Sequence, residues 1–463
     1  MAVDAPTPPA ALQATASRAG LGARLPFTPG IRRNLAWKGG SVVVEKLLRL
    51  GVIVLAMRLL GAEGWGRYSF ALTWALLLVQ GTDLGLALFI ARETARTGRP
   101  DPQLIGEVLT LKGALSLLYL AAMAGLVWWH RDEPVVAAAL AICTFAALGS
   151  STLEAINHVF RGVQDLALEA RANSFHAMLQ FVIGCAVLAG AAVVWERGLT
   201  AGPGESGEAE ILIAYALSTV AAACLALVWS GRLLLRVTRP RPGLSRANLV
   251  RFRREVLPLG IAIVASLIYY KVDIVMLREL RGDTETGLYA AGYKALELLA
   301  VVPSILLAAT FPALSQALVR DRVESRRLHR TALRLLVIVG LAAAVPLAVI
   351  PHWLTAILGP RFAGTAPMLQ ALAPCVVLTF VNYLETHMLV ALGLVRMQML
   401  LSIALIGVNV AANLVLIPRY GGVGAAWATA LTELALLAAC LVLVHRGLNR
   451  APLPPNLATS HAE

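Results

Sequence analysis

Long apolar stretches alternate with short polar ones along almost the whole chain. A pass with a window of about 19 residues finds about 12 stretches long enough to cross a hydrocarbon core of about 30 Å as helices. They lie within residues 41–60, 68–91, 104–129, 135–160, 172–195, 210–235, 255–277, 287–318, 330–352, 367–393, 396–418 and 422–445. The stretches are continuously apolar rather than alternating every second residue, and a helix satisfies its own backbone hydrogen bonds in lipid. The pattern predicts an all-α polytopic membrane protein.

The longest polar interruption divides the predicted helices into two groups of six and marks a hinge between two lobes around a central cavity. We expect five regions, in chain order: a disordered cytoplasmic tail at 1–36, an N-terminal six-helix lobe at 37–235, a basic cytoplasmic inter-lobe loop at 236–254, a C-terminal six-helix lobe at 255–447 and a second cytoplasmic tail at 448–463. The inter-lobe loop is rich in arginine and could also hold anionic lipid headgroups.

A short sequence repeat supports two related halves. Gly61-Ala-Glu-Gly-Trp-Gly66-Arg-Tyr68 follows the first predicted helix, and Gly282-Asp-Thr-Glu-Thr-Gly287-Leu-Tyr289 follows the seventh. Both segments share the pattern Gly-x4-Gly-x-Tyr. Because each half has an even number of predicted helices, the two halves have the same orientation and are related by an axis along the membrane normal.

Composition and charge exclude a soluble enzyme and give an orientation. Of 463 residues, 58% are hydrophobic and 14% are charged, and the net charge is +13. If the N-terminus is cytoplasmic, cytoplasmic segments hold about 25 basic residues and external loops about seven, as the positive-inside rule requires. The expected topology is therefore N-in and C-in. The distribution explains the surplus charge by topology, so we expect no nucleic-acid partner.

Charged residues inside the predicted first and seventh helices indicate a polar cavity, because a charge at the centre of a membrane helix costs about 2.5–3.5 kcal/mol. Glu45, Lys46 and Arg49 share one helix face. With the repeat offset of 221 (282 minus 61), Arg49 maps to position 270, next to Lys271. We predict that these cations line the cavity. The alternative is that they reach the lipid headgroups or form ion pairs with neighbouring helices.

The predicted eighth helix carries Tyr289, Tyr293 and Glu297 on one face, with Lys294 close to Glu297. Aromatic faces beside polar groups suit sugar rings. The same tyrosines also suit an interfacial aromatic belt, and Lys294 and Glu297 could form only an intrahelical pair.

Two intramembrane carboxylates, Asp83 and Asp273, are candidates for ion coupling. No Walker loop, His-Glu-x-x-His or dinucleotide fingerprint is present in the sequence, and the five cysteines have no paired spacing, so we expect no catalytic residue, metal site or cofactor. No external loop is large enough for a catalytic domain, which argues against a membrane enzyme that polymerises or ligates glycans.

Several blocks resemble Wzx-type polysaccharide flippases of the multidrug/oligosaccharidyl-lipid/polysaccharide (MOP) exporter superfamily. In chain order they are Asn34-Leu-Ala-Trp-Lys-Gly-Gly, Arg58-Leu-Leu-Gly-Ala-Glu-Gly-Trp-Gly-Arg-Tyr, Asp83-Leu-Gly-Leu, Leu257-Pro-Leu-Gly, Asp273-Ile-Val-Met-Leu, Gly287-Leu-Tyr-Ala-Ala-Gly-Tyr, Phe311-Pro-Ala-Leu-Ser and Ile417-Pro-Arg-Tyr-Gly-Gly-Val-Gly-Ala-Ala. The resemblance covers about residues 31–447. It implies two six-helix lobes around a lumen that is often cationic, in agreement with Arg49 and Lys271.

The resemblance also implies a function. The expected substrate is an oligosaccharide on a polyprenyl pyrophosphate, flipped by alternating access across the bacterial cytoplasmic membrane for O-antigen, capsule or exopolysaccharide synthesis. Membrane lipids are expected partners, and a polysaccharide polymerase and other assembly proteins are further candidates. The main alternative is a drug or metabolite exporter of the same superfamily coupled to Na⁺ or H⁺, for which organic cations would favour a carboxylate-lined cavity. A structural membrane scaffold is a further alternative.

Overall fold

The computed structural model describes residues 29–196 and 205–449, and within these ranges it contains helices and no strand. The long helices are α1 (Pro29–Val79), α3 (Pro102–Trp129), α4 (Pro134–Gly162), α5 (Leu166–Glu196), α6 (Glu205–Val237), α8 (Leu257–Arg281), α9 (Asp283–Leu299), α10 (Val301–Arg320), α11 (Arg322–Val349), α13 (Thr365–Ala391) and α14 (Val395–Asn449). The short elements are η1 (Gln80–Thr82), α2 (Leu86–Thr97), α7 (Arg246–Glu255), α12 (His352–Leu358) and η2 (Pro360–Phe362). The predicted all-α class is confirmed.

The number of membrane crossings depends on how the bent helices are counted. Nine helices in the described ranges are long and apolar enough to cross a membrane, or ten if the bent pair formed by α1 and α2 is one span. In addition, α1 and α14 are each two helices joined at a glycine, Gly61 and Gly421. At 1.5 Å per residue, the arms of α14 before and after Gly421 are each long enough to cross. Twelve crossings therefore stay a prediction.

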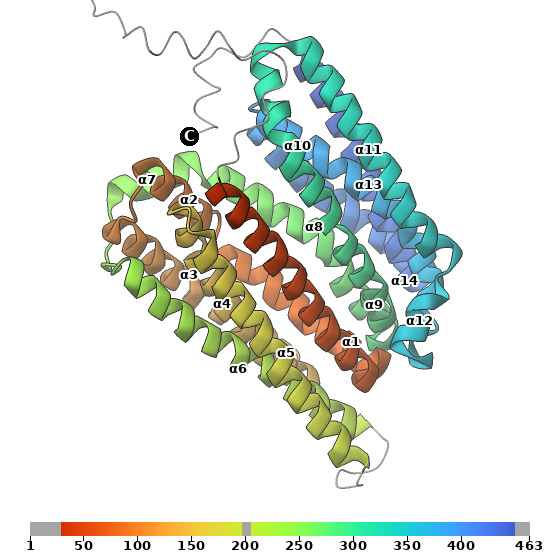
Figure 1. Cartoon of the computed structure of the whole chain (residues 1–463). Coiled ribbons are helices and arrows are strands. Elements are labelled where there is room, and N and C mark those ends of the chain that lie inside the picture. The colour runs from red at the N-terminus through yellow and green to blue at the C-terminus, as the bar shows by residue number, and fades with distance from the viewer. Residues whose placement is uncertain (1–28, 197–204, 450–463) are drawn as a thin grey trace, which may run out of the picture.

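The helices form two lobes that lie side by side (Figure 1). In the N-terminal lobe, α1 packs on α4, α5 and α6; in the C-terminal lobe, α8 and α13 pack on α14, and α11 packs on α13. Contacts between α1 and the helices α8 and α9 join the lobes. The assignment of residue ranges to five regions stays a prediction. Residues 1–28 and 450–463 of the predicted tails lie outside the described residues, and α1 begins at Pro29, so 29–36 are helical.

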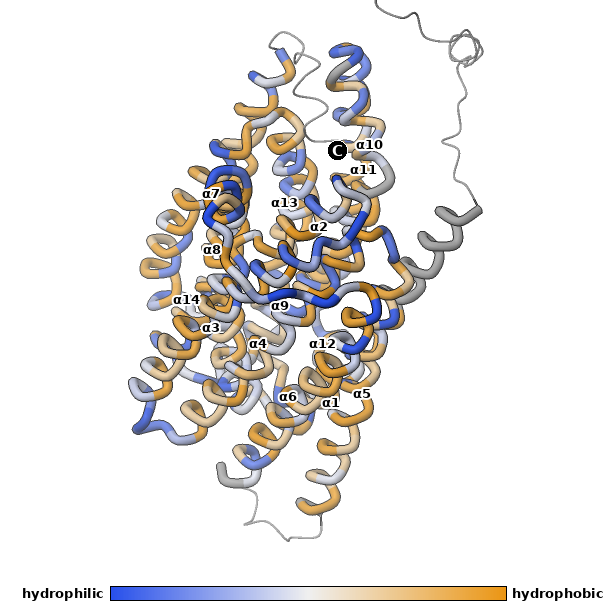
Figure 2. Tube along the Cα trace, turned by 90° about the vertical axis from the view of Figure 1, so that its left-hand side faces the viewer, coloured by the Kyte–Doolittle hydropathy of each residue, from blue (hydrophilic) through white to orange (hydrophobic). Residues whose placement is uncertain are grey.

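Large apolar side chains are exposed on the outside of both lobes, as expected of a surface that lipid covers. Examples with more than half of the side chain exposed are Leu117, Leu118, Phe145, Leu225, Ile338 and Leu400. Figure 2 shows hydrophobic residues along most of the long helices and hydrophilic residues at α7. This multi-pass arrangement identifies a membrane protein.

The predicted repeat is present in the backbone as well as in the sequence. Gly61 has φ 67° and ψ −174°, and Gly282 has φ 86° and ψ −178°. These positive φ values are readily adopted only by glycine, so each half turns at the same place for the same reason.

We call the end of the molecule that holds these two turns the hairpin end. The other end, where α1 begins and α14 ends, is the terminal end (Figure 1).

The lobes cross at the hairpin end through a reciprocal pair of glycines. A Cβ atom on Gly66 would overlap the carbonyl oxygen of Asp283, and a Cβ atom on Gly287 would overlap the carbonyl oxygen of Ala62. The repeat offset of 221 relates Gly66 to Gly287 and Ala62 to Asp283. Each lobe therefore presents the same small surface to the other, and the pseudo-twofold axis passes through this crossing. Glycine allows the two backbones to approach closely.

Candidate functional site

A cavity of about 250 Å³, lined by both polar and apolar side chains, lies at the junction of the lobes. The helices α1, α4, α5 and α6 of the N-terminal lobe line most of it, and Lys294 of α9 contributes from the C-terminal lobe. Its polar and aromatic lining residues are Arg49, Trp65, Tyr68, Ser150, Gln180, Tyr215, Thr219 and Lys294. The volume is slightly below the range of about 300–1,000 Å³ that is common for small-molecule sites. The cavity therefore has room for a headgroup rather than a whole oligosaccharide.

Arg49 lines this cavity and pairs with Glu45, whose Oε1 lies 3.2 Å from Nη2 of the arginine. The Nε atom of Arg49 is buried and has no hydrogen-bond partner among the described residues. The indole nitrogen of Trp65, another lining residue, is buried in the same unpartnered way. Lys46 is exposed, one turn from the cavity-lining arginine. The Arg49 Nε and Trp65 indole nitrogens therefore both lack an acceptor among the described residues in this conformation.

Lys271 and Lys294 share one carboxylate. Glu297 accepts from Lys294 Nζ at 2.7 Å through Oε2 and from Lys271 Nζ through Oε1. Lys271 also lies 4.7 Å from the centre of the Tyr293 ring. Arg49 and Lys294 are the two cations that line the cavity, and no carboxylate is among its described lining residues. Lys271 does not line the cavity and instead pairs with Glu297.

Tyr289 and Tyr293 lie inside the C-terminal lobe and do not line the cavity, with 0% and 1% of their surfaces exposed. The Tyr289 hydroxyl donates to Asp273 Oδ2, and the Tyr293 hydroxyl donates to the carbonyl oxygen of Tyr270 at 2.7 Å. Asp273 also accepts from the Thr429 hydroxyl at 3.2 Å and from the Ile274 backbone at 2.8 Å. The buried carboxylate is fully hydrogen-bonded in this conformation, as burial requires. The aromatic residues that line the cavity are Trp65, Tyr68 and Tyr215.

Asp83 lies in the break between the short helix η1 and the helix α2. Its carboxylate accepts from the backbone N–H groups of Gly85 and Ala87, both at 3.2 Å, at the start of α2. Its Oδ1 also lies 3.9 Å from Nζ of Lys112, a buried lysine that donates to Ser151 at 2.8 Å. Asp83 therefore orients the start of α2 in addition to any role in ion coupling.

We expect Asp83→Ala to lower the free energy of unfolding by about 1 kcal/mol, because two N–H groups at a helix start lose their acceptor. The two N–H groups donate to different oxygens, so Asp83→Asn retains one acceptor and should restore about half of that stability. Urea unfolding of the purified chain in detergent, followed by circular dichroism, measures both. Equal losses in the two variants would show that charge next to Lys112, and not the hydrogen bonds, accounts for the effect.

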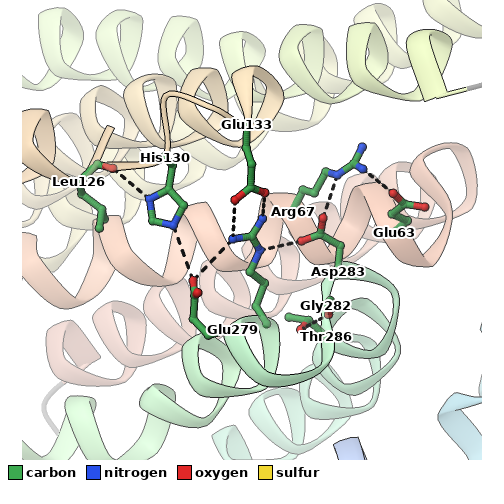
Figure 3. A network of polar contacts seen from close by, with 10 residues as sticks. Glu63, Arg67, Leu126, His130, Glu133, Glu279, Gly282, Asp283 and Thr286 are labelled. Carbon is green, nitrogen blue, oxygen red and sulfur yellow. Dashed lines mark hydrogen bonds and ion pairs between the residues drawn. The ribbon is translucent and has the colours of Figure 1, made fainter. Parts of the chain in front are cut away.

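A network of ion pairs joins the lobes at the hairpin end (Figure 3). Arg278 is central: its guanidinium pairs with Glu133 of the N-terminal lobe and with Asp283 at 2.9 Å. Asp283 in turn pairs with Arg67 of the N-terminal lobe at 3.0 Å. The network therefore bridges the same two turns that the glycine crossing brings together.

Two further pairs extend this connection. His130 lies 3.6 Å from Glu279, a pair that is ionic only when the histidine is protonated, and Arg361 lies 2.9 Å from Glu208. In each pair one residue belongs to each lobe. With the glycine crossing, these contacts hold the lobes together at the hairpin end in this conformation.

Sequence reasoning missed the network and part of the cavity. Ser150, Gln180 and Thr219 are single neutral polar residues in apolar helices, and such residues are common at helix–helix contacts generally. Arg67 and Arg278 are among the roughly seven basic residues that the positive-inside count assigns to external loops, and that count does not reveal their partners. A signal existed for the network, since Arg67 follows the glycine of one repeat and Asp283 lies inside the other.

A family model described as polysaccharide biosynthesis protein matches residues 31–318, which is more than half of the chain. The chain belongs to the polysaccharide biosynthesis protein family. The resemblance to Wzx-type flippases of the MOP superfamily is thereby confirmed. A search of curated proteins found no match.

Several solved structures with a similar fold are described as transporters. An inward-facing MATE family multidrug transporter of the MOP superfamily has a TM-score of 0.68 and 14% identity, over 87% of this chain and 95% of that chain. The MATE multidrug transporter DinF-BH has a TM-score of 0.65 and 15% identity, over 93% and 97%. An outward-facing MATE structure has a TM-score of 0.56 and 16% identity, over 89% and 94%. At these identities the likeness shows the fold alone, and that fold has two lobes.

Proposed function

We propose that the chain flips a polyprenyl-pyrophosphate-linked oligosaccharide across the bacterial cytoplasmic membrane during the synthesis of O-antigen, capsule or exopolysaccharide. The observation that carries the proposal is that Arg49 and Lys294, from different lobes, line one cavity and that no carboxylate is among its described lining residues. Family membership and a transporter fold support it. A pyrophosphate is a doubly suitable ligand, because it carries negative charge and many acceptor oxygens.

The physical need for such a cavity is large. A hydroxyl group moved into hydrocarbon without a partner costs about 4–8 kcal/mol, so an oligosaccharide with about ten hydroxyls faces a barrier of tens of kcal/mol in bare lipid. A polar passage between the lobes lowers this barrier because it supplies hydrogen-bond partners. In the proposed mechanism Arg49 and Lys294 bind the pyrophosphate, and the polyprenyl chain stays in the bilayer. Lys271, through the shared Glu297, orients Lys294.

The ion-pair network suggests which side is closed. With the topology expected from the basic residues, the hairpin end is external and the terminal end is cytoplasmic. The pairs of Arg278 and Arg67 then close the external side in this conformation. Alternating access requires that these pairs separate when the lobes rock apart.

The alternative is a cation-coupled exporter of the same superfamily. Buried Asp273 and the helix-capping Asp83 are its candidate coupling residues, and the fold relatives are described as multidrug transporters. Two cations and no carboxylate are among the described residues that line the cavity, which favours an anionic substrate over an organic cation.

Reconstitution separates the two functions. The purified chain in proteoliposomes should move a fluorescent polyprenyl-pyrophosphate oligosaccharide to the outer leaflet, where a membrane-impermeant reductant quenches it, and should not transport ethidium. Imposed proton and sodium gradients, applied separately, then test coupling. Ethidium transport with no movement of the glycolipid would contradict the proposed function.

A further inference from the structure

The short helix α7 between the lobes has two different faces. One face is docked on the N-terminal lobe: Arg251 pairs with Glu93 of α2, Asn248 donates to Glu107 of α3 at 2.9 Å, and Phe252 is 7% exposed. The last residue, Glu255, lies 3.4 Å from Arg92 of α2. These contacts fix the rotation of α7 about its axis, and therefore fix which residues face away from the protein.

The outward face of α7 combines arginines with apolar residues. Arg246, Leu249, Val250, Arg253 and Arg254 are all exposed, and their spacing of three and four residues places them on one stripe of the helix. Leu249 and Val250 are 46% and 37% exposed. None of the three arginines has an acidic partner in the part of the chain that the structure describes.

The segment that leads into α7 extends this surface. Arg236, Arg239 and Arg241 are also exposed and have no acidic partner among the described residues, and Leu244 is 62% exposed. Figure 1 places α7 at the same end of the molecule as the end of α6 and the start of α8, which is where the membrane-crossing helices terminate. A basic surface with apolar residues between the charges, at this depth, matches an interfacial helix.

We infer that the outward face of α7 and the segment before it form a binding surface for anionic phospholipid headgroups of the adjoining leaflet. The arginines supply charge-assisted hydrogen bonds to the phosphates, while Leu244, Leu249 and Val250 insert among the first acyl carbons. Lipid is the occupant that both features fit, because an acidic soluble ligand would leave the exposed apolar residues uncovered. The surface is separate from the cavity that holds Arg49, and the inference does not depend on the transported substrate.

The position of α7 places this surface next to a contact between the two lobes. Val256 is the single residue between α7 and α8. Gly260, in the first turn of α8, lies close to the Leu84 backbone of the N-terminal lobe. A headgroup bound to α7 therefore lies next to a second close contact between the lobes, at the terminal end. Anionic lipid held there stabilises the docked position of α7.

Lipid binding to the full-length chain tests the inference. Purified protein in detergent is titrated with phosphatidylglycerol or with phosphatidylcholine of the same acyl chains, and bound lipids are counted by native mass spectrometry. We expect a preference for phosphatidylglycerol, since each arginine near anionic headgroups contributes about a fivefold change in binding. The triple variant Arg246→Gln, Arg253→Gln, Arg254→Gln should reduce that preference by about tenfold or more.

A matched control removes the same charge elsewhere at the same end. Arg320, Arg327 and Arg330 are exposed at the α10–α11 junction. Their triple replacement by glutamine should lower the preference less than the α7 variant does, because Arg327 already pairs with Glu324. An equal loss in both triple variants, or equal binding of both lipids by the unaltered chain, would overturn the inference.

Two further measurements identify the source of the phosphate group and keep the test independent of variant folding. Binding of phosphatidylglycerol to the unaltered chain should weaken as salt is raised from about 0.1 M to about 1 M, because salt screens exposed charges. Inorganic phosphate at millimolar concentration should not displace the lipid, because it lacks the acyl chains that Leu249 contacts. Displacement by phosphate would mean that the surface binds a soluble anion and would contradict the assignment to lipid.

Discussion

Replacement of Arg49 by alanine is expected to lower the initial rate of glycolipid flipping by about tenfold to a hundredfold, because a hydrogen bond to a charged group contributes about 1.5–3 kcal/mol. Arg49 lines the cavity, and its Nε atom has no partner among the described residues. The alanine variant also leaves Glu45 without its cationic partner. The unpaired Glu45 carboxylate then repels an anionic headgroup. Flipping in proteoliposomes at equal protein density measures the rate.

Two variants define what Arg49 contributes. Arg49→Lys keeps the charge but loses the planar donor fork, so we expect an intermediate rate. Arg232→Ala removes an exposed arginine of α6 in the same lobe that is not among the residues lining the cavity, and it should retain the full rate. If Arg49→Ala flips the glycolipid as fast as Arg232→Ala, the cavity is not the path of the headgroup.

Replacement of Gly287 by alanine is expected to open the hairpin end. The added Cβ atom would overlap the carbonyl oxygen of Ala62, which belongs to the backbone and cannot rotate away. Overpacking of this kind costs about 1–3 kcal/mol, which shifts an equilibrium between two conformations by about 5-fold to 150-fold. The lobes should therefore separate where the Arg67 and Arg278 pairs now hold them.

Spin labels on the two lobes measure this opening. Asp132 and Thr284 are exposed near the hairpin end, one in each lobe, and labels there should move apart in the Gly287→Ala variant. Gly66→Ala should have the same effect, because the repeat makes the two glycines equivalent. Gly113→Ala, in α3, is the control, since nothing lies within 4 Å of a Cβ atom at that position. An unchanged distance in both crossing variants would show that the close approach does not hold the lobes together.

Hydropathy was sufficient for the all-α class because a membrane helix satisfies its hydrogen bonds within one segment, so each span is encoded locally. The repeat was also visible locally, since only glycine readily adopts the positive φ at Gly61 and Gly282. The family likeness was carried by short blocks of neighbouring residues. For the same reason the sequence could name Arg49 and Lys271 as charges that lipid disfavours.

The partners of those charges were beyond the reach of a sequence pattern. Lys294 and Lys271 meet on Glu297, and Tyr289 faces Asp273 rather than the cavity, because helix rotation and lobe packing decide which side each residue presents. Lys46 lies one turn from Arg49 yet is exposed.

The sequence by itself determined the helices, their turns at glycine and the excess of positive charge, since these depend on residues close together in the chain. Only the tertiary structure decided that Arg49 and Lys294 line one cavity, that Arg67 and Arg278 join the lobes at the hairpin end, and that α7 presents its arginines outward. Such contacts join residues up to hundreds of positions apart. Their geometry follows from how whole helices pack, and no local periodicity encodes that packing.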